Sequence, residues 1–156
     1  MSASDLTTKS VAPIRVARVT GQARSTAHEE IGPLTQQLFG RLMEPIMRRQ
    51  IAIAGPTLAT YEPTGDGGLT VSACCPVGPD TAAVDGLEFV ELPGLERVVT
   101  ARHDGAMAGL GAAYGALERW VADQGLTTDG TAREVYLVSF PEPEDRWRTE
   151  VQLPVS

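Results

Sequence analysis

The sequence predicts an α+β domain in which a strand–helix–strand–strand unit occurs twice and the strands form a mostly antiparallel sheet. Two observations carry this prediction. Similar residues recur in the same order 75 positions apart, and each copy holds one amphipathic helix pattern followed by two strand-like runs. The matching pairs are Phe39 and Tyr114, Gly40 and Gly115, Leu42 and Leu117, Ile46 and Val121, Ile51 and Leu126, Gly55 and Gly130, and Tyr61 and Tyr136.

The repeat sets the expected boundaries within the 156 residues. We expect a disordered or extended N-terminus over residues 1–13 and one domain over 14–155. The two repeats cover about 14–77 and 95–155, and residues 78–94 join them. Two related units in one chain predict a pseudo-twofold arrangement with two main helices and a central ligand cleft at the junction of the units.

Each element of the first unit has its own sequence signal. Residues 14–20 alternate apolar and polar side chains, which is typical of a strand. A helix is expected from about Thr26, an N-cap candidate with Glu29 three residues later, and Pro45 should kink it or end its regular part. Strands follow over about 51–61 and 69–75, around a glycine-rich turn. The apolar stripe of the helix consists of Leu34, Leu38, Leu42 and Ile46.

The second unit repeats this order after a connecting segment. Residues 87–92 predict an extra strand, and the unit then opens with a strand over 95–102. Its helix is expected over about 106–124, with Gly125 as the C-terminal glycine. Two strands, about 133–140 and 146–155, form a hairpin around an acidic loop. The helix stripe consists of Met107, Leu110, Tyr114, Leu117 and Val121.

The charge and the apolar content of the chain exclude several classes of partner. The net charge is −7, with 13 basic against 20 acidic residues, which argues against direct nucleic-acid binding. No run approaches the roughly 18 apolar residues that a membrane span needs, and the polar N-terminus has no signal core. The adjacent Cys74 and Cys75 offer no disulfide or metal-site spacing. We therefore expect a cytoplasmic protein, and a homodimer is compatible with the sequence.

Glu134 is the main candidate for a functional residue. It is the one charge within the apolar run from Glu134 to Phe140, and a carboxylate in apolar surroundings costs several kcal/mol unless it is paired or hydrogen-bonded. Two interpretations are open. Glu134 either lies at the strand start and reaches water or pairs with Arg133 or Arg148, or it is the acid of a ligand pocket.

Three aromatic residues are candidates for the walls of such a pocket. Tyr136 shares a strand face with Glu134, Tyr61 holds the corresponding position in the first repeat, and Trp120 lies at the edge of the second helix stripe. An aromatic pocket with one acid suits a cationic or planar apolar ligand. The alternative is that these aromatic residues are ordinary core.

Other chemistry is poorly supported by the sequence. No phosphate-binding glycine loop, dinucleotide motif or nucleophile elbow is found, so no cofactor is expected. The two histidines have no neighbours at metal-ligand spacing, so no metal site is expected. His103-Asp104 is half of a catalytic dyad without a nucleophile, and a surface turn explains it better.

The chain resembles the GyrI-like effector-binding domains of multidrug-responsive bacterial regulators, over about residues 14–155. The resemblance rests on four stretches. They are Arg133-Glu134-Val135-Tyr136-Leu137, Thr149-Glu150-Val151-Gln152-Leu153-Pro154-Val155, Phe89-Val90-Glu91-Leu92-Pro93-Gly94 and Tyr114-Gly115-Ala116-Leu117-Glu118-Arg119-Trp120.

The resemblance implies a pocket acid at Glu134 and pocket aromatics at Trp120, Tyr61 and Tyr136. It implies a free-standing small-molecule-binding protein that captures hydrophobic, planar or cationic compounds, since no DNA-binding helix-turn-helix precedes residue 14. One branch of the family opens cyclopropanes of natural products, so a hydrolase that uses Glu134 to position or activate water is the alternative. A gyrase-modulating interaction protein is the second alternative.

Overall fold

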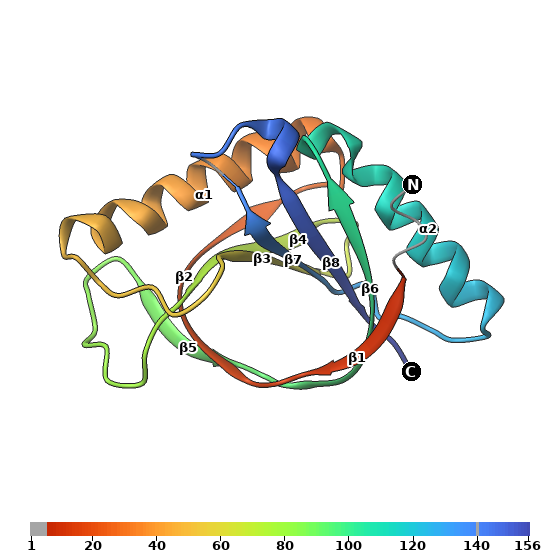
Figure 1. Cartoon of the computed structure of the whole chain (residues 1–156), viewed down its shortest axis with the longest axis horizontal. Coiled ribbons are helices and arrows are strands. Elements are labelled where there is room, and N and C mark those ends of the chain that lie inside the picture. The colour runs from red at the N-terminus through yellow and green to blue at the C-terminus, as the bar shows by residue number, and fades with distance from the viewer. Residues whose placement is uncertain (1–5, 140) are drawn as a thin grey trace. The chain divides into compact units, whose positions relative to one another are not determined.

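The computed structural model describes residues 6–139 and 141–156, and they form two compact units (Figure 1). One unit is Pro13–Pro93, and the other joins the N-terminal strand to the segment that begins at Gly94. Each unit is a four-stranded antiparallel sheet with one long helix on one face. The predicted α+β class and the duplicated strand–helix–strand–strand unit are confirmed.

In the first unit, β2 is an inner strand of the sheet. It pairs with β4 on one side and with β5 on the other, and β3 pairs with the far edge of β4. Helix α1 packs on β2 and β4. The elements are β2 (Ile14–Ala23), α1 (His28–Arg48), β3 (Leu58–Pro63), β4 (Leu69–Pro76) and β5 (Glu88–Leu92).

The second unit has the same arrangement. β6 pairs with β1 and with β8, and β8 pairs with β7. Helix α2 packs on β6 and β8. The elements are β1 (Thr7–Val11), β6 (Leu95–Asp104), the short 3-10 helix η2 (Met107–Gly109), α2 (Leu110–Asp123), β7 (Ala132–Val138), the short 3-10 helix η3 (Glu144–Arg146) and β8 (Arg148–Pro154).

The edge strand of each unit comes from the chain segment that leads into the other unit. β1 precedes β2 in the sequence but pairs with β6, and β5 precedes β6 but pairs with β2. Thr7 lies opposite Thr100, and their hydroxyl oxygens are 2.8 Å apart. Glu88 lies opposite Arg18 and forms a 2.7 Å ion pair with it. Pairing between distant segments of this kind leaves no local pattern in the sequence.

The start of α1 differs from the expectation. The predicted cap at Thr26 is wrong, because the helix begins at His28. Its N-cap residue is Ala27, which makes no side-chain cap hydrogen bond. Glu30 replaces the expected capping acid: its carboxylate accepts hydrogen bonds from the backbone N–H of Arg24 and from the Ser25 hydroxyl. The helix also continues through Pro45 to Arg48, so Pro45 does not end it.

The strand expected over 51–61 begins later, at Leu58. Before it, Ile53 forms only an isolated bridge to Val77. Pro56 lies in this stretch and has no N–H to contribute to a ladder, which explains the late start. The strand expected over 87–92 and the glycine at the end of the second helix are confirmed, since Gly125 has a φ of 69°.

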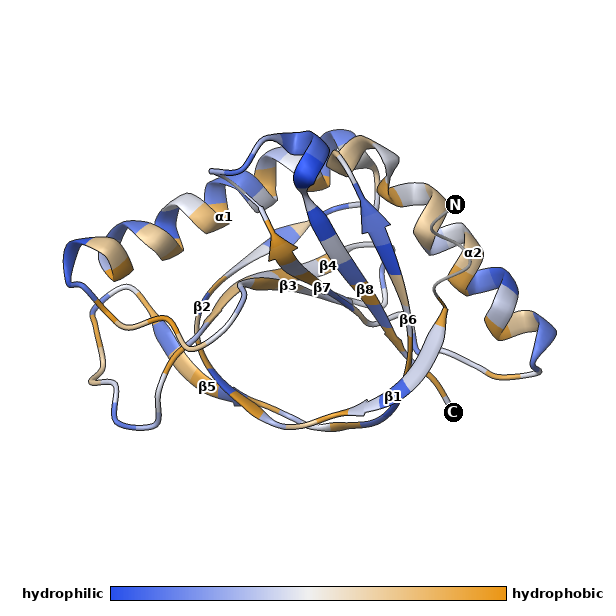
Figure 2. Ribbon diagram, in the orientation of Figure 1, coloured by the Kyte–Doolittle hydropathy of each residue, from blue (hydrophilic) through white to orange (hydrophobic). Residues whose placement is uncertain are grey.

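The core of each unit lies between its helix and its sheet. Leu38, Leu42 and Ile46 of α1 are at most 1% exposed, and Leu117 of α2 is fully buried. Along α1, apolar and polar residues alternate around the ribbon, as expected for a helix with one covered face (Figure 2). In the part of the chain that the structure describes, no helix combines the length and apolarity that crossing a membrane requires.

Cys75 is buried on β4, and burial raises the pKa of its thiol to about 11. Since the thiolate is the reactive form, we expect negligible reaction with a disulfide reagent at pH 7.5. In a Cys74→Ala variant, which leaves this single thiol, labelling should take place only with unfolding. Rapid stoichiometric labelling of the folded variant, measured by absorbance, would contradict this expectation.

Candidate functional site

Glu134 lies on β7 and is 7% exposed. It is the direct partner of Val151 on β8, and Tyr136 is the partner of Thr149. Because side chains alternate along a strand, Glu134 and Tyr136 project from the same face of the sheet. The interpretation that Glu134 reaches water at the strand start is therefore wrong, and its carboxylate requires compensation inside the protein.

Two tyrosines compensate the Glu134 carboxylate. The hydroxyl of Tyr114 donates a hydrogen bond to Oε2 at 2.5 Å, and the hydroxyl of Tyr136 donates one to Oε1 at 2.9 Å. Each carboxylate oxygen thus accepts a phenol O–H, which stabilises the ionised form. Hydrogen bonds to a charged group are worth about 1.5–3 kcal/mol each, so the two bonds together are of the same order as the several kcal/mol that burying an ion costs.

Tyr114 is a site residue that the sequence analysis missed. It lies on α2, where its spacing of four residues from Leu110 and three from Leu117 places it in the apolar stripe of the helix. A usable signal was present: a tyrosine inside a buried stripe needs a partner for its hydroxyl. The nearest unexplained acceptor in the second unit was Glu134, twenty residues later.

Trp120 lies on the same helix as Tyr114 but on a different part of its circumference. The two residues are six positions apart in an α-helix, which places their side chains about 120° apart around the axis and about 9 Å apart along it. Leu117, which is fully buried, lies between them. Trp120 is half-buried, and among the described contacts its side chain makes no hydrogen bond to Glu134. Its role as a pocket wall stays a prediction.

Tyr61 occupies the matching place in the first unit. It lies on β3, is 8% exposed and is the direct partner of Val71, which in turn lies opposite Gly21. A Cβ added to Gly21 would lie 3.1 Å from Leu34 of α1, so this face of the sheet is the one that α1 covers. Tyr61 and Tyr136 therefore both project from the helix-covered face of their own sheet. Their participation in one shared pocket stays a prediction.

His103 is not part of a surface turn. It is 9% exposed on β6, and its Nε2 lies 2.8 Å from the carbonyl oxygen of Ala106. Asp104 is exposed and forms an ion pair with Arg102, so the two residues do not act as a dyad. Among residues 6–139 and 141–156, no group of three or more metal-ligating side chains could hold a metal ion.

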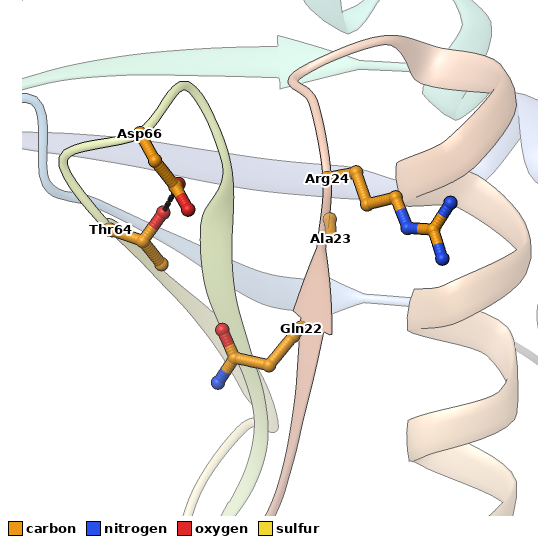
Figure 3. Close-up of a pocket in the computed structure, with 5 residues that line it drawn as sticks. All are labelled: Gln22, Ala23, Arg24, Thr64 and Asp66. Atoms are coloured by element: carbon orange, nitrogen blue, oxygen red, sulfur yellow. Dashed lines mark hydrogen bonds between the residues drawn. The ribbon is translucent and has the colours of Figure 1, made fainter.

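Two hollows in the described surface are lined by residues other than Glu134 and its two tyrosine partners. One, of about 230 Å³, is lined by Gln22, Ala23, Arg24, Thr64 and Asp66, and Figure 3 shows Arg24 pointing away from the hydrogen-bonded Thr64 and Asp66. The other, of about 470 Å³, borders the loop around Trp147 and has Asp104 and Val138 on its wall. Neither hollow is lined by Glu134, Tyr114 or Tyr136.

Comparison with known proteins supports the fold described above. The model of the family "GyrI-like small molecule binding domain" matches residues 8–156. The structure is similar to the C-terminal domain of EcmrR, with a TM-score of 0.75 and 20% identity over 97% of each chain. It is also similar to EcmrR in a DNA complex, with a TM-score of 0.78 and 19% identity over 97% of this chain. The chain spans 57% of the length of that EcmrR chain.

Two further solved structures share the fold. SAV2435 bound to tetraphenylphosphonium has a TM-score of 0.69 and 12% identity, over 97% of this chain and 94% of that one. A hydrolase encoded by lin2189 from Listeria innocua has a TM-score of 0.63 and 14% identity, over 97% and 91%. Identities this low establish the fold alone. No curated protein matches the sequence significantly.

Replacing Tyr114 by Phe removes one donor from the buried Glu134 carboxylate. We expect the free energy of unfolding to fall by about 1–3 kcal/mol, measured by urea denaturation followed by circular dichroism. In a Glu134→Gln background, where the charge is already absent, the same replacement should cost less. Equal losses in the two backgrounds would show that the phenol does not stabilise the carboxylate.

Proposed function

Because the chain belongs to the GyrI-like small-molecule-binding domain family, we propose that it captures hydrophobic, planar or cationic compounds, and that Glu134 is the anionic partner of a bound cation. Tyr114 and Tyr136 are the first aromatic contacts of that ligand. Trp120 is a further wall of the same pocket. The observation that carries the proposal is a buried carboxylate whose two oxygens each accept a phenol hydrogen bond.

The hydrogen bonds explain how a cation would be recognised. Two phenol donors favour a negative charge at a site that is 7% exposed, where water screens the charge weakly. The same phenol rings carry electron-rich faces, which attract an organic cation at close range. A ligand with a delocalised positive charge and aromatic surface satisfies both features, whereas a small hydrated cation would use only the carboxylate.

The charge of the whole chain and one structural neighbour support the same class of ligand. A net charge of −7 favours the approach of cations. SAV2435, which has the same fold, has been solved with tetraphenylphosphonium, a bulky aromatic cation. The neighbour supports the choice of probe, and the Glu134 geometry supplies the reason why such a probe would bind.

A matched pair of ions tests the proposal. Tetraphenylphosphonium and tetraphenylborate have nearly the same shape and opposite charge. We expect the phosphonium to raise the melting temperature and to bind in calorimetry, and the borate to do neither. Glu134→Gln should weaken phosphonium binding at least about tenfold, which corresponds to about 1.4 kcal/mol.

The control for this test is Glu118→Gln, which removes an exposed acid from the same helix that carries Tyr114. It should leave the affinity for tetraphenylphosphonium within a factor of about two, because exposed charges are screened. Equal weakening by the two variants would mean that only the overall charge attracts the cation. No binding by the unmodified protein would reject the proposed ligand class.

Hydrolysis is the second candidate, and the close Tyr114–Glu134 pair is the observation that favours it. The carboxylate would take a proton from water as the water oxygen bonds to one cyclopropane carbon and the adjacent carbon–carbon bond breaks. The Tyr114 phenol would protonate the released carbon, and Glu134 would then return its proton to the phenolate. Both carboxylate oxygens already accept a phenol hydrogen bond, so we rank binding first.

Incubation with an excess of an electrophilic cyclopropane separates the two functions. The binding proposal predicts that no more than one equivalent disappears, as followed by chromatography. Consumption over many equivalents that is lost in Glu134→Gln, with binding retained, would establish the hydrolase instead.

A further inference from the structure

The segment that leads from β6 into α2 is held to the sheet by the side chain of His103. His103 lies opposite Thr149, which lies opposite Tyr136, so the three residues form one row across the helix-covered face. The His103 Nε2 donates to the carbonyl oxygen of Ala106 at 2.8 Å. This carbonyl also accepts the backbone N–H of Gly109 at 3.1 Å, one residue before α2 begins.

Gly109 lies against the His103 ring, and no room is left there for a side chain. A Cβ at this position would lie 2.8 Å from the ring Cε1 and 3.3 Å from Nε2. Contacts below 3.0 Å require one of the partners to move. Since His103 is 9% exposed and hydrogen-bonded, its ring has little freedom to yield. The glycine therefore permits the histidine to lie directly under the start of the helix.

Neighbouring contacts fix the same segment. The N–H of Gly105, a residue with a φ of 110°, donates to the carbonyl oxygen of Trp147 at 2.9 Å. The hydroxyl of the fully buried Thr149 lies 3.9 Å from the sulfur of Met107. Neither η2 nor α2 has a side-chain cap hydrogen bond, so the start of the helix is held by these contacts and by the hydrogen bond from His103 to Ala106.

The start of α2 determines where Tyr114 lies. Tyr114 is five residues after Gly109, about 7.5 Å along the helix axis, and its hydroxyl must come within 2.5 Å of the Glu134 carboxylate. A displacement of about 1 Å at the phenol oxygen is enough to remove a hydrogen bond of this length. We propose that His103, lying against Gly109, is a positioning residue that holds the start of α2 and thereby keeps Tyr114 on Glu134.

One expected effect of this positioning rests on the proposed function: a shift of the helix start should weaken the affinity for the cation. The positioning itself can be read without a ligand. Protein labelled with carbon-13 at the tyrosine Cζ shows one signal for each tyrosine, and Tyr114→Phe identifies the signal of Tyr114. Glu134→Gln then shows where that signal lies when the phenol no longer donates to a carboxylate.

Two variants disturb the anchor in different ways. His103→Leu removes the donor to Ala106, and Gly109→Ala displaces the ring while keeping the imidazole. Both should move the Tyr114 signal toward its position in Glu134→Gln and weaken tetraphenylphosphonium binding by about fivefold, which is less than the effect of Glu134→Gln because the carboxylate is retained. His103→Gln, which retains an N–H donor, should restore the signal.

Gly111→Ala is the matched control for Gly109→Ala. It adds the same methyl group two residues later, where nothing lies within 4 Å, and it should leave the Tyr114 signal in place. If His103→Leu does not fold, the comparison of Gly109→Ala with Gly111→Ala still tests the inference. An unchanged Tyr114 signal in Gly109→Ala would overturn the inference, whatever happens to stability.

The two proposals fail in distinguishable ways. If the unmodified protein does not bind tetraphenylphosphonium, the proposed function fails, and the Tyr114 signal still tests the role of His103. If the cation binds and the Tyr114 signal is insensitive to Gly109→Ala, the positioning inference fails alone.

Discussion

The buried carboxylate of Glu134 is the constraint around which the second unit is organised. A charge at 7% exposure is tolerated only when hydrogen bonds replace the lost water, and here the donors come from two different elements. Tyr136 is supplied by the same strand and follows from strand geometry. Tyr114 is supplied by α2, so the helix must begin at a defined place on the sheet.

This requirement connects the site to parts of the unit that never contact a ligand. His103 lies next to the end of strand β6, the turn contains Gly105 in a left-handed conformation, and Gly109 leaves room for the imidazole ring. Each of these residues contributes to where α2 starts. The stability of the helix start and the geometry of the carboxylate are therefore two consequences of the same contacts.

Only the second of the two repeated units carries this acid. Tyr61 corresponds to Tyr136 and lies on the equivalent helix-covered face, but Ala59 stands two residues before it where Glu134 stands in the second unit. Ala59 is fully buried and needs no compensating donor, and Phe39 accordingly takes the place of Tyr114. The unit that lacks the charge thus also lacks the phenol at the matching helix position.

The sequence by itself determined the fold class, the repeat, most of the elements and the acid at Glu134, because hydrophobic periodicity and a lone charge in an apolar run are local signals. Only the tertiary structure decided that β1 pairs with β6 and β5 with β2, and that Ser25 and Glu30, not Thr26, order the entry to α1. It also decided that Tyr114 and Tyr136 share Glu134 and that His103 lies under the helix start. These facts depend on contacts between residues far apart in the chain, and the burial that makes them necessary exists only after the helix and the sheet have packed.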